Sequence, residues 1–221
     1  MTVTDAALVV AIDGPSGSGK SSVAKEAARR LGAAYLDTGA MYRAVTWHCL
    51  DAGTDLDDAD AVAQAVRAAE LEISTDPSLE RVRIHGTDVT ETIRLPFVSE
   101  AVSAVATNLD VREEMVRRQR ALIAAQPRIV AEGRDITTVV APDAKTRILL
   151  TASEEARLRR RGIQLGEADA AALQRQVIER DAKDSTVSNF TRASDGVITL
   201  DSSDLTFEQT VQAVLTLVDE G

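Results

Sequence analysis

The segment Gly14-Pro-Ser-Gly-Ser-Gly-Lys-Ser21 constrains the fold of this 221-residue chain more than any other part of it. It follows a short apolar run, Leu8 to Ile12, that is partly β-branched and is ended by Asp13-Gly14, as expected of a buried parallel strand. After the glycines, apolar residues recur at helical spacing from Ser21 to Leu31, and Gly32 suits the end of a helix. The sequence therefore predicts a strand, a glycine-rich turn and a helix in direct succession.

The glycine-rich segment fits G-x-x-x-x-G-K-[S/T], the pattern of a phosphate-binding loop (P-loop), in the strand-to-helix context that the pattern requires. A chance serine-glycine turn would not need that context. Gly17 and Gly19 allow successive N–H groups to point into one concavity, Lys20 can reach the β- and γ-phosphates, and Ser21 can ligate Mg²⁺. We expect a nucleoside triphosphate with magnesium, held by Gly14, Ser16, Gly17, Ser18, Gly19, Lys20, Ser21 and Ser22.

Beyond this loop, short apolar runs alternate with helical stretches, which is typical of an α/β fold with a mostly parallel sheet covered by helices on both faces. The alternation is broken by residues 71–93, which read as short strands with turns and predict a small antiparallel insert. Two helices are expected after it, at about 99–108 and 111–125. The further core strands are expected at 34–37, 128–131, 146–151 and 196–200.

Composition excludes several classes of partner. A net charge of −10 and an aromatic content of 3% argue against binding nucleic acid or an anionic membrane surface. The single Cys49 cannot form an internal disulfide, the first residues lack a secretory signal, and no apolar run approaches the roughly 20 residues that span a bilayer. We therefore expect a cytoplasmic protein, and the acidic surface without a long amphipathic stripe favours a monomer.

Two other loops should open beside the P-loop, because the carboxyl ends of parallel strands face a common crevice. Asp37-Thr38-Gly39 follows one predicted strand and leads to Arg43, and Gly133-Arg134-Asp135 follows another. Arginines can bind a second phosphate through paired hydrogen bonds, so the set suggests an acceptor that carries phosphate. The alternatives are a solvated helix residue for Arg43 and a turn residue paired with Asp135 for Arg134.

The arginine-rich stretch from Arg157 to Arg161 and the polar, turn-rich segment beginning at Arg180 predict a mobile lid that closes over the transferring phosphoryl group and excludes water. An exposed basic helix is the alternative, and it accounts better for Arg159 and Arg161. The chain has no N-K-x-D motif for reading guanine, and residues 128–132 resemble the Walker B strand of large ATPases only loosely.

Taken together, the segments IDGPSGSGKSSVAK, YLDTGAMYR, VREEMVRRQR, VAEGRDITTVV, ERDAKD and LDSSDLTFEQ have the order and spacing of bacterial-type cytidylate kinases, members of the P-loop nucleoside monophosphate kinases. The resemblance covers nearly the whole chain, and LDTGAMYR with GRDITTVVAPDA is its most specific part. It implies a P-loop kinase fold and transfer of the γ-phosphoryl group of ATP, with Mg²⁺, to CMP or dCMP. It also implies a core at 1–38, 126–152 and 196–221, a monophosphate-binding region at 39–125 and a lid at about 153–195.

The resemblance also implies roles for individual residues. A carboxylate at Asp135 can accept from the N4 amino group of cytosine, whereas uracil would present a carbonyl there and be rejected. The residues expected to bind CMP are Thr38, Arg43, Ser103, Arg112, Arg134, Asp135, Arg180 and Asp184. The residues expected to take part in the transfer are Lys20, Arg134, Arg157 and Arg161, with Ser21 on the metal.

One position departs from the family pattern. Relatives commonly carry an arginine three residues after Asp184, where this chain has Val187. Either Arg192 takes over that contact or the contact is missing, and tolerance of UMP depends on which holds. Two other functions stay open at this point: a P-loop kinase for another small acceptor, and an ATP-binding regulator that hydrolyses ATP slowly and signals through a partner.

Overall fold

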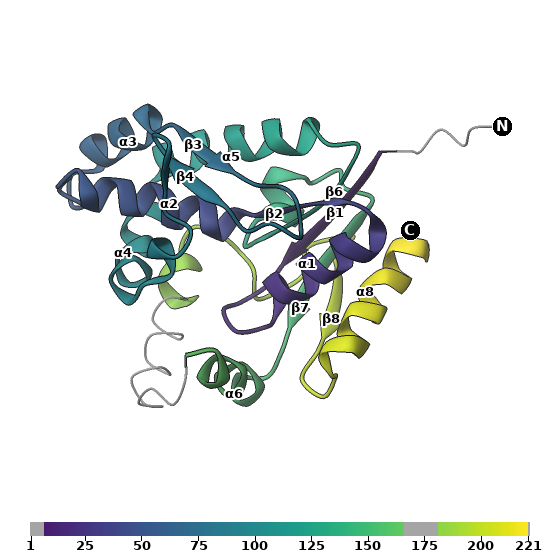
Figure 1. Cartoon of the computed structure of the whole chain (residues 1–221). Helices are drawn as coiled ribbons and strands as arrows, with labels where there is room; N and C mark the ends of the chain where they lie inside the picture. Colours follow the sequence, from purple (N-terminus) through teal and green to yellow (C-terminus); the bar gives the residue numbers. More distant parts are fainter. Residues whose placement is uncertain (1–6, 166–180, 221) are drawn as a thin grey trace.

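The structure, a computed structural model, describes residues 7–165 and 181–220, with the side chains of residues 161–165 left aside. A five-stranded sheet in the order β2-β6-β1-β7-β8 runs through its centre, and every pairing in that sheet is parallel (Figure 1). This confirms the predicted α/β class. The strands are β1 (Leu8–Asp13), β2 (Ala34–Asp37), β6 (Arg128–Gly133), β7 (Thr146–Thr151) and β8 (Ile198–Asp201).

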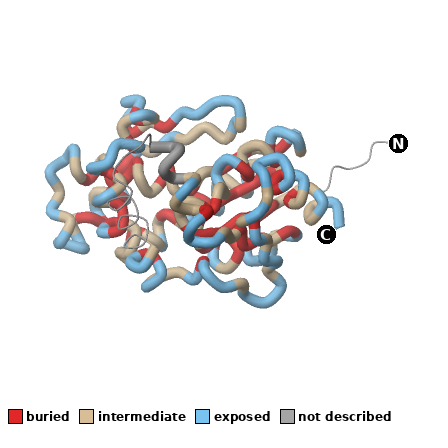
Figure 2. Tube along the Cα trace, turned by 90° about the horizontal axis from the view of Figure 1, so that it is seen from below, coloured by how far each residue is buried: buried red, intermediate tan, exposed pale blue. Residues whose placement is uncertain are grey.

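Helices cover both faces of this sheet, because successive side chains of each strand point to opposite sides. Val10 and Ile12 of β1 pack with α1 (Lys20–Leu31) and α8 (Phe207–Glu220), whereas Ala11 belongs to a separate apolar cluster. That second cluster contains α2 (Thr38–Asp51), α3 (Ala59–Ala68) and α5 (Leu109–Ala124). Figure 2 shows the buried residues concentrated along the central strands. The core is thus two apolar layers separated by the sheet.

The predicted insert is present as a small antiparallel sheet of β3 (Leu71–Ile73), β4 (Val82–Ile84) and β5 (Thr87–Asp88). A 3-10 helix (Thr92–Arg94) and α4 (Pro96–Ala106) follow it. Helix α4 begins three residues before the predicted start, because proline is favoured in the first helical turn, where it loses no hydrogen bond.

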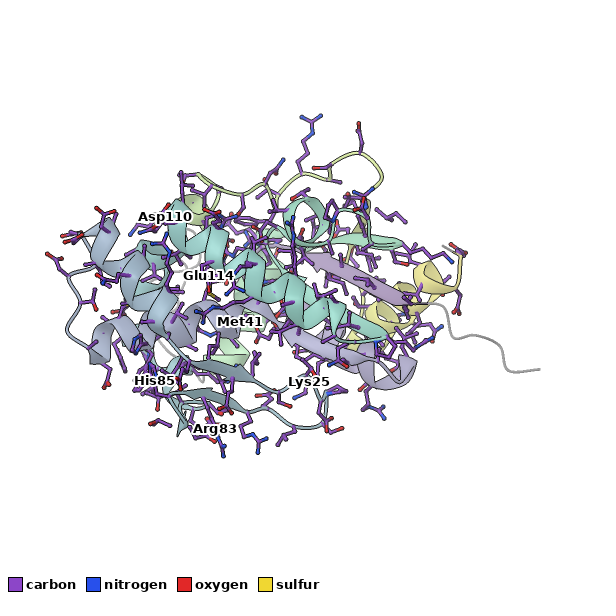
Figure 3. All side chains as sticks on the ribbon, turned by 90° about the horizontal axis from the view of Figure 1, so that it is seen from above. Lys25, Met41, Arg83, His85, Asp110 and Glu114 are labelled. Atoms are coloured by element: carbon purple, nitrogen blue, oxygen red, sulfur yellow. The ribbon has the colours of Figure 1, made fainter. Side chains whose placement is uncertain are left out.

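The insert is joined to the core at the edge of the large sheet. The backbone N–H of Tyr35 in β2 donates to the carbonyl of Thr75 over 2.8 Å, so the loop after β3 covers that sheet edge. Lys25 of α1 and Arg94 both pair with Glu80, at 2.6 and 2.9 Å. Figure 3 shows Lys25 on the same side of the molecule as the strand residue Arg83 and the turn residue His85.

A short π-helix (Ile136–Val140) follows β6, and Asp13 holds it in place. The buried Asp13 carboxylate accepts from the backbone N–H groups of Ile136 and Thr137, each at 2.8 Å, and from the Thr137 hydroxyl at 2.6 Å. Burial raises the pKa of Asp13 to about 6, although the hydrogen bonds from Thr137 oppose that rise. The carboxyl end of β1 thereby fixes the backbone that directly follows Arg134 and Asp135.

Helix α6 (Glu154–Leu165) lies next to the P-loop, where the carbonyl of Arg157 would be only 2.9 Å from a Cβ atom added at Gly17. Within the described part of the chain, no helix is both long enough and apolar enough to cross a membrane.

Candidate active site

A cavity of about 450 Å³ opens at the carboxyl ends of the central strands. Its wall is formed by the P-loop, the ends of β2 and β6, helices α4 and α5, and the segment 184–188. Twelve of the predicted site residues line it: Ser16, Gly17, Gly19, Lys20, Ser21, Ser22, Thr38, Arg43, Arg112, Arg134, Asp135 and Asp184. The strand-end loops therefore converge as the sheet topology predicted.

The P-loop has the backbone that its glycines permit. Gly17 and Gly19 have φ values of 78° and 88°, in the left-handed region that side chains disfavour, and α1 begins directly at Lys20. Gly14 lies beneath the loop, where a Cβ atom would come 2.3 Å from the carbonyl oxygen of Leu150. Ser18 is buried there too. Gly14 and Ser18 do not line the cavity, whereas the other predicted P-loop residues do.

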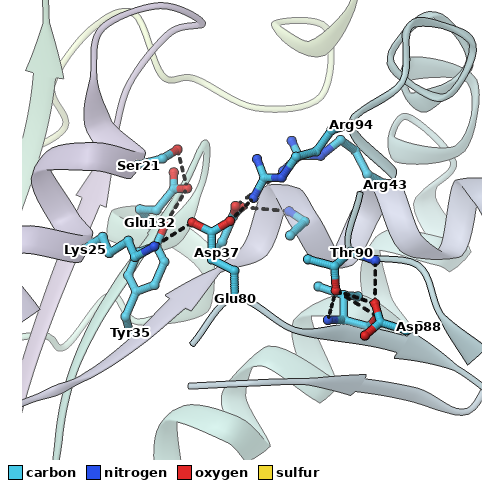
Figure 4. A network of polar contacts seen from close by, with 12 residues as sticks. Ser21, Lys25, Tyr35, Asp37, Arg43, Glu80, Asp88, Thr90, Arg94 and Glu132 are labelled. Atoms are coloured by element: carbon cyan, nitrogen blue, oxygen red, sulfur yellow. Dashed lines mark hydrogen bonds and ion pairs between the residues drawn. The ribbon is translucent and has the colours of Figure 1, made fainter. Parts of the chain in front are cut away.

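Ser21 donates to the carboxylate of Glu132, the penultimate residue of β6, over 2.7 Å. Figure 4 shows this pair together with Tyr35 and Asp37, and all four residues line the cavity. Burial, and then the negative charge of Asp37, raise the pKa of Glu132 to about 7. Glu132 was considered in the sequence only as a loose Walker B match, so its contact with Ser21 is a finding of the structure.

The pKa of Asp37 is lowered, whereas that of Glu132 is raised. Burial alone would raise the pKa of Asp37, but Arg43 and the N–H of Ala40 lower the pKa below the ordinary value. Its carboxylate caps α2 by accepting from Ala40 over 2.7 Å and pairs with Arg43 at 3.3 Å. Two neighbouring carboxylates are thus held in different environments, one beside an arginine and one beside a hydroxyl.

The oxygen atoms of Ser21, Glu132 and Asp37 are hard ligands of the kind that Mg²⁺ prefers. No group of three or more His, Cys, Asp or Glu side chains in the described residues could hold a metal by itself.

On the far side of the cavity, Thr38 donates to the carbonyl of Glu132 over 2.8 Å, which ties the start of α2 to β6. Arg112 of α5 forms a hydrogen-bonded ion pair with Asp135. The alternative in which Asp135 pairs with Arg134 at the turn is therefore wrong. Burial raises the pKa of Asp135, and Arg112 opposes this rise.

Ser103 is buried and does not line the cavity. Its hydroxyl donates to Asp184 over 2.9 Å, so it touches a predicted substrate-binding carboxylate instead. Val187 lines the cavity, whereas Arg192 is exposed and lies outside it. In this structure the position expected to carry an arginine therefore presents Val187 to the cavity.

The residues after position 180 bring a carboxylate onto the P-loop. Asp181 accepts from the backbone N–H of Ser16 over 3.1 Å, and pairs with Arg157 at 2.6 Å and with Arg134 at 3.1 Å. Arg157 also donates to the carbonyl of Ser16 over 3.0 Å. One P-loop amide and two arginines therefore converge on a single anionic group.

Helix α6 contacts the P-loop through a residue that the sequence did not single out. Arg160 donates to the carbonyl of Ser18 over 3.1 Å and to the carbonyl of Ser202 over 2.6 Å. Arg159 is exposed, as expected. The side chain of Arg161 and the whole of Arg180 lie outside the described residues.

Comparison with known proteins decides the family. The family model for cytidylate kinase matches residues 10–220. The chain belongs to the cytidylate kinase family. Curated cytidylate kinases from Streptomyces avermitilis and Rhodococcus opacus are 46% and 50% identical to it, over 97% and 99% of this chain and 94% and 97% of theirs. The resemblance seen in the motifs is thereby confirmed.

Proteins whose sequences differ strongly from this chain share its fold. A gluconokinase from Sinorhizobium meliloti 1021 has a TM-score of 0.53 at 15% identity, covering 97% of this chain and 93% of its own. At that identity the likeness concerns the fold alone, and it agrees with the predicted P-loop kinase fold.

In this chain, motif spacing points to the strand-end loops and misses the residues that join them. Glu132 could have been found, because an acidic residue at the end of a strand next to a P-loop is a frequent metal partner. Asp181 and Arg160 lie in segments that the sequence singled out, but their partners could not be predicted, and the buried Phe190 carried no signal, since all these partners lie far away in the sequence.

Proposed function

We propose that the protein transfers the γ-phosphoryl group of ATP to CMP or dCMP, giving ADP with CDP or dCDP. The observation that carries this is one cavity that joins a P-loop to a second set of arginines, Arg43 and Arg134, in a chain of the cytidylate kinase family. A phosphate donor and a phosphate-bearing acceptor would each have cationic partners in the same cavity.

ATP would be held by the amide groups of the P-loop and the N-terminus of α1, with Lys20 on its β- and γ-phosphates. Ser21, supported by Glu132, would hold Mg²⁺, and Asp37 lies close enough in the same network to orient it. The bound metal supplies charge neutralisation to the phosphates.

The phosphate of CMP would bind Arg43 and Arg134, with Thr38 beside them. The acceptor oxygen of a nucleoside monophosphate is already anionic, so no general base is required. Arg134 and Arg157 would stabilise the charge that spreads over the transferring group, and Arg161 and Arg180 are proposed to help from the lid. Alignment and charge neutralisation then account for the chemistry.

Asp135 and Arg112 would read the base. The carboxylate can accept from the N4 amino group of cytosine, and the guanidinium can donate to O2 and N3. Uracil would set its O4 carbonyl against the carboxylate, which leaves buried acceptors unpaired. Ser103 would act through Asp184, which is proposed to contact the sugar.

We further propose that the chain is divided as its motifs suggest, into a core (1–38, 126–152 and 196–221), a monophosphate-binding region (39–125) and a lid (153–195). In this division Asp181 of the lid contacts the backbone N–H of Ser16 in the core. We also propose a monomer, because the chain combines a net charge of −10 with no long amphipathic stripe.

The test is ADP release by the purified protein, with ATP and Mg²⁺, in the presence of CMP, dCMP, UMP, AMP or no acceptor. Rapid release with CMP and dCMP, and little without acceptor, is the expected result. Turnover with UMP as fast as with CMP would assign the loss of discrimination to Val187, for which Val187→Arg is the matching variant. ATP loss that is indifferent to every acceptor would contradict the proposal and favour an ATP-binding regulator.

A further inference from the structure

Phe190 is fully buried although it is not part of the apolar core. Its side chain is 0% exposed, yet every other residue of the segment 185–197 is exposed or half-buried. It belongs to neither of the two apolar clusters formed by the described residues. The burial of this ring within a polar segment therefore depends on a contact outside the two apolar clusters.

That partner is Arg134. The guanidinium carbon of Arg134 lies 4.4 Å from the centroid of the Phe190 ring. The two terminal nitrogens of Arg134 pair with Asp184 at 2.8 Å and with Asp181 at 3.1 Å. The cation is therefore held at its face by a ring and at its edge by two carboxylates, all three from residues 181–190.

The ring contact and the carboxylate contacts use different parts of the Arg134 guanidinium group. Carboxylates form ion pairs along the N–H edge, which is also the edge that a phosphate binds through paired hydrogen bonds. Nη1 of Arg134 has no hydrogen-bond partner among the described residues, so this edge keeps an N–H group for an acceptor phosphate. The ring uses the guanidinium face and takes up no N–H group, so its attraction can persist while the edge binds phosphate.

We propose that Phe190 is a positioning residue that orients the guanidinium of Arg134 through its aromatic face before and during phosphate binding. The inference rests on the proposed function, in which Arg134 binds the acceptor phosphate. It concerns the electron-rich face of the ring, because an aliphatic side chain of similar volume would fill the same space without attracting the cation.

The experiment places phenylalanine carrying one, two or three ring fluorines at position 190 of the full-length protein. Fluorine withdraws charge from the ring face with little change in volume. We expect kcat/KM for CMP to fall stepwise, reaching about tenfold with three fluorines. The KM for ATP should stay the same, and the melting temperature should fall by no more than a few degrees, because the same attraction is present in the ligand-free protein. The same series at Phe207, which is 51% exposed on α8, is the control and should leave all values unchanged.

A second measurement does not depend on any substrate. Rotation about the Nε–Cζ bond of Arg134, followed by nitrogen NMR in the ligand-free protein, should be slow in the wild type and faster with the trifluorinated ring. Phe190→Leu should behave like the trifluorinated protein in both assays.

The outcomes separate the two proposals. A flat fluorine series with unchanged Arg134 rotation would overturn the positioning role, even in an active kinase. A protein that turns over no acceptor, yet shows fluorine-dependent rotation of Arg134, would overturn the proposed function and keep the orientation of Arg134 by Phe190.

Discussion

Replacing Glu132 with glutamine is expected to stabilise the ligand-free protein at alkaline pH, although it should impair the reaction. The carboxylate is 2% exposed, and its pKa rises from the ordinary 4.5 to about 7 because it is buried beside Asp37. At roughly 1.4 kcal/mol per pH unit, that difference corresponds to about 3 kcal/mol.

The direction of the effect follows from where the proton is bound. Between pH 4.5 and about 7 the folded protein keeps a proton on Glu132 that the unfolded chain has released, so stability from this group falls as the pH rises. Above pH 7 the folded state must bury the charge. Glutamine keeps the shape and an oxygen for Ser21 without that cost. The titration of Asp13 is common to both proteins and cancels in the comparison.

The assay is urea unfolding of the wild type and Glu132→Gln at pH 5 and pH 8. The variant should exceed the wild type by up to about 3 kcal/mol at pH 8 and by little at pH 5. Glu26→Gln is the control, since Arg29 and Arg30 lower the pKa of the half-buried Glu26 to about 2, and its loss should not stabilise the protein at pH 8. An equal difference between wild type and Glu132→Gln at both pH values would refute the reasoning.

Three further predictions follow from the cavity. Lys20→Ala should abolish phosphoryl transfer and leave the unfolding curve unchanged; near-normal turnover would remove Lys20 from its role. Asp135→Asn should lower kcat/KM for CMP at least tenfold and leave ATP affinity intact, because one good polar contact to the base is worth roughly that much; equal weakening of both would place Asp135 on the triphosphate side. Asp181→Asn should tighten ATP binding severalfold in calorimetry, since its carboxylate competes for the Ser16 N–H and Arg157; weaker binding would contradict that competition.

Sequence patterns were enough to locate the elements that carry the site. The strand at Leu8–Asp13, the glycine loop and the strand at Ala34–Asp37 each have a strong local signal, and parallel topology then brings their carboxyl ends together. The pairing of Arg112 with Asp135 was anticipated only as two separate contacts to a base. Local periodicity carries no information on which distant side chains meet.

The contacts that were missed depend on packing across large sequence separations. Asp181 reaches an amide 165 residues earlier in the chain, and Phe190 covers an arginine 56 positions before it. The π-helix at Ile136–Val140 depends on Asp13, which lies more than 100 residues away. In each case the decisive partner is set by the tertiary fold and has no signature in its own neighbourhood.

The most direct test of the account follows the phosphoryl group itself. The purified protein is incubated with CMP, Mg²⁺ and ATP labelled in the γ-phosphoryl group, and the labelled products are separated. The account predicts that the label appears in the β-phosphate of CDP, with little in inorganic phosphate. Label released as inorganic phosphate at the same rate with and without CMP would contradict it.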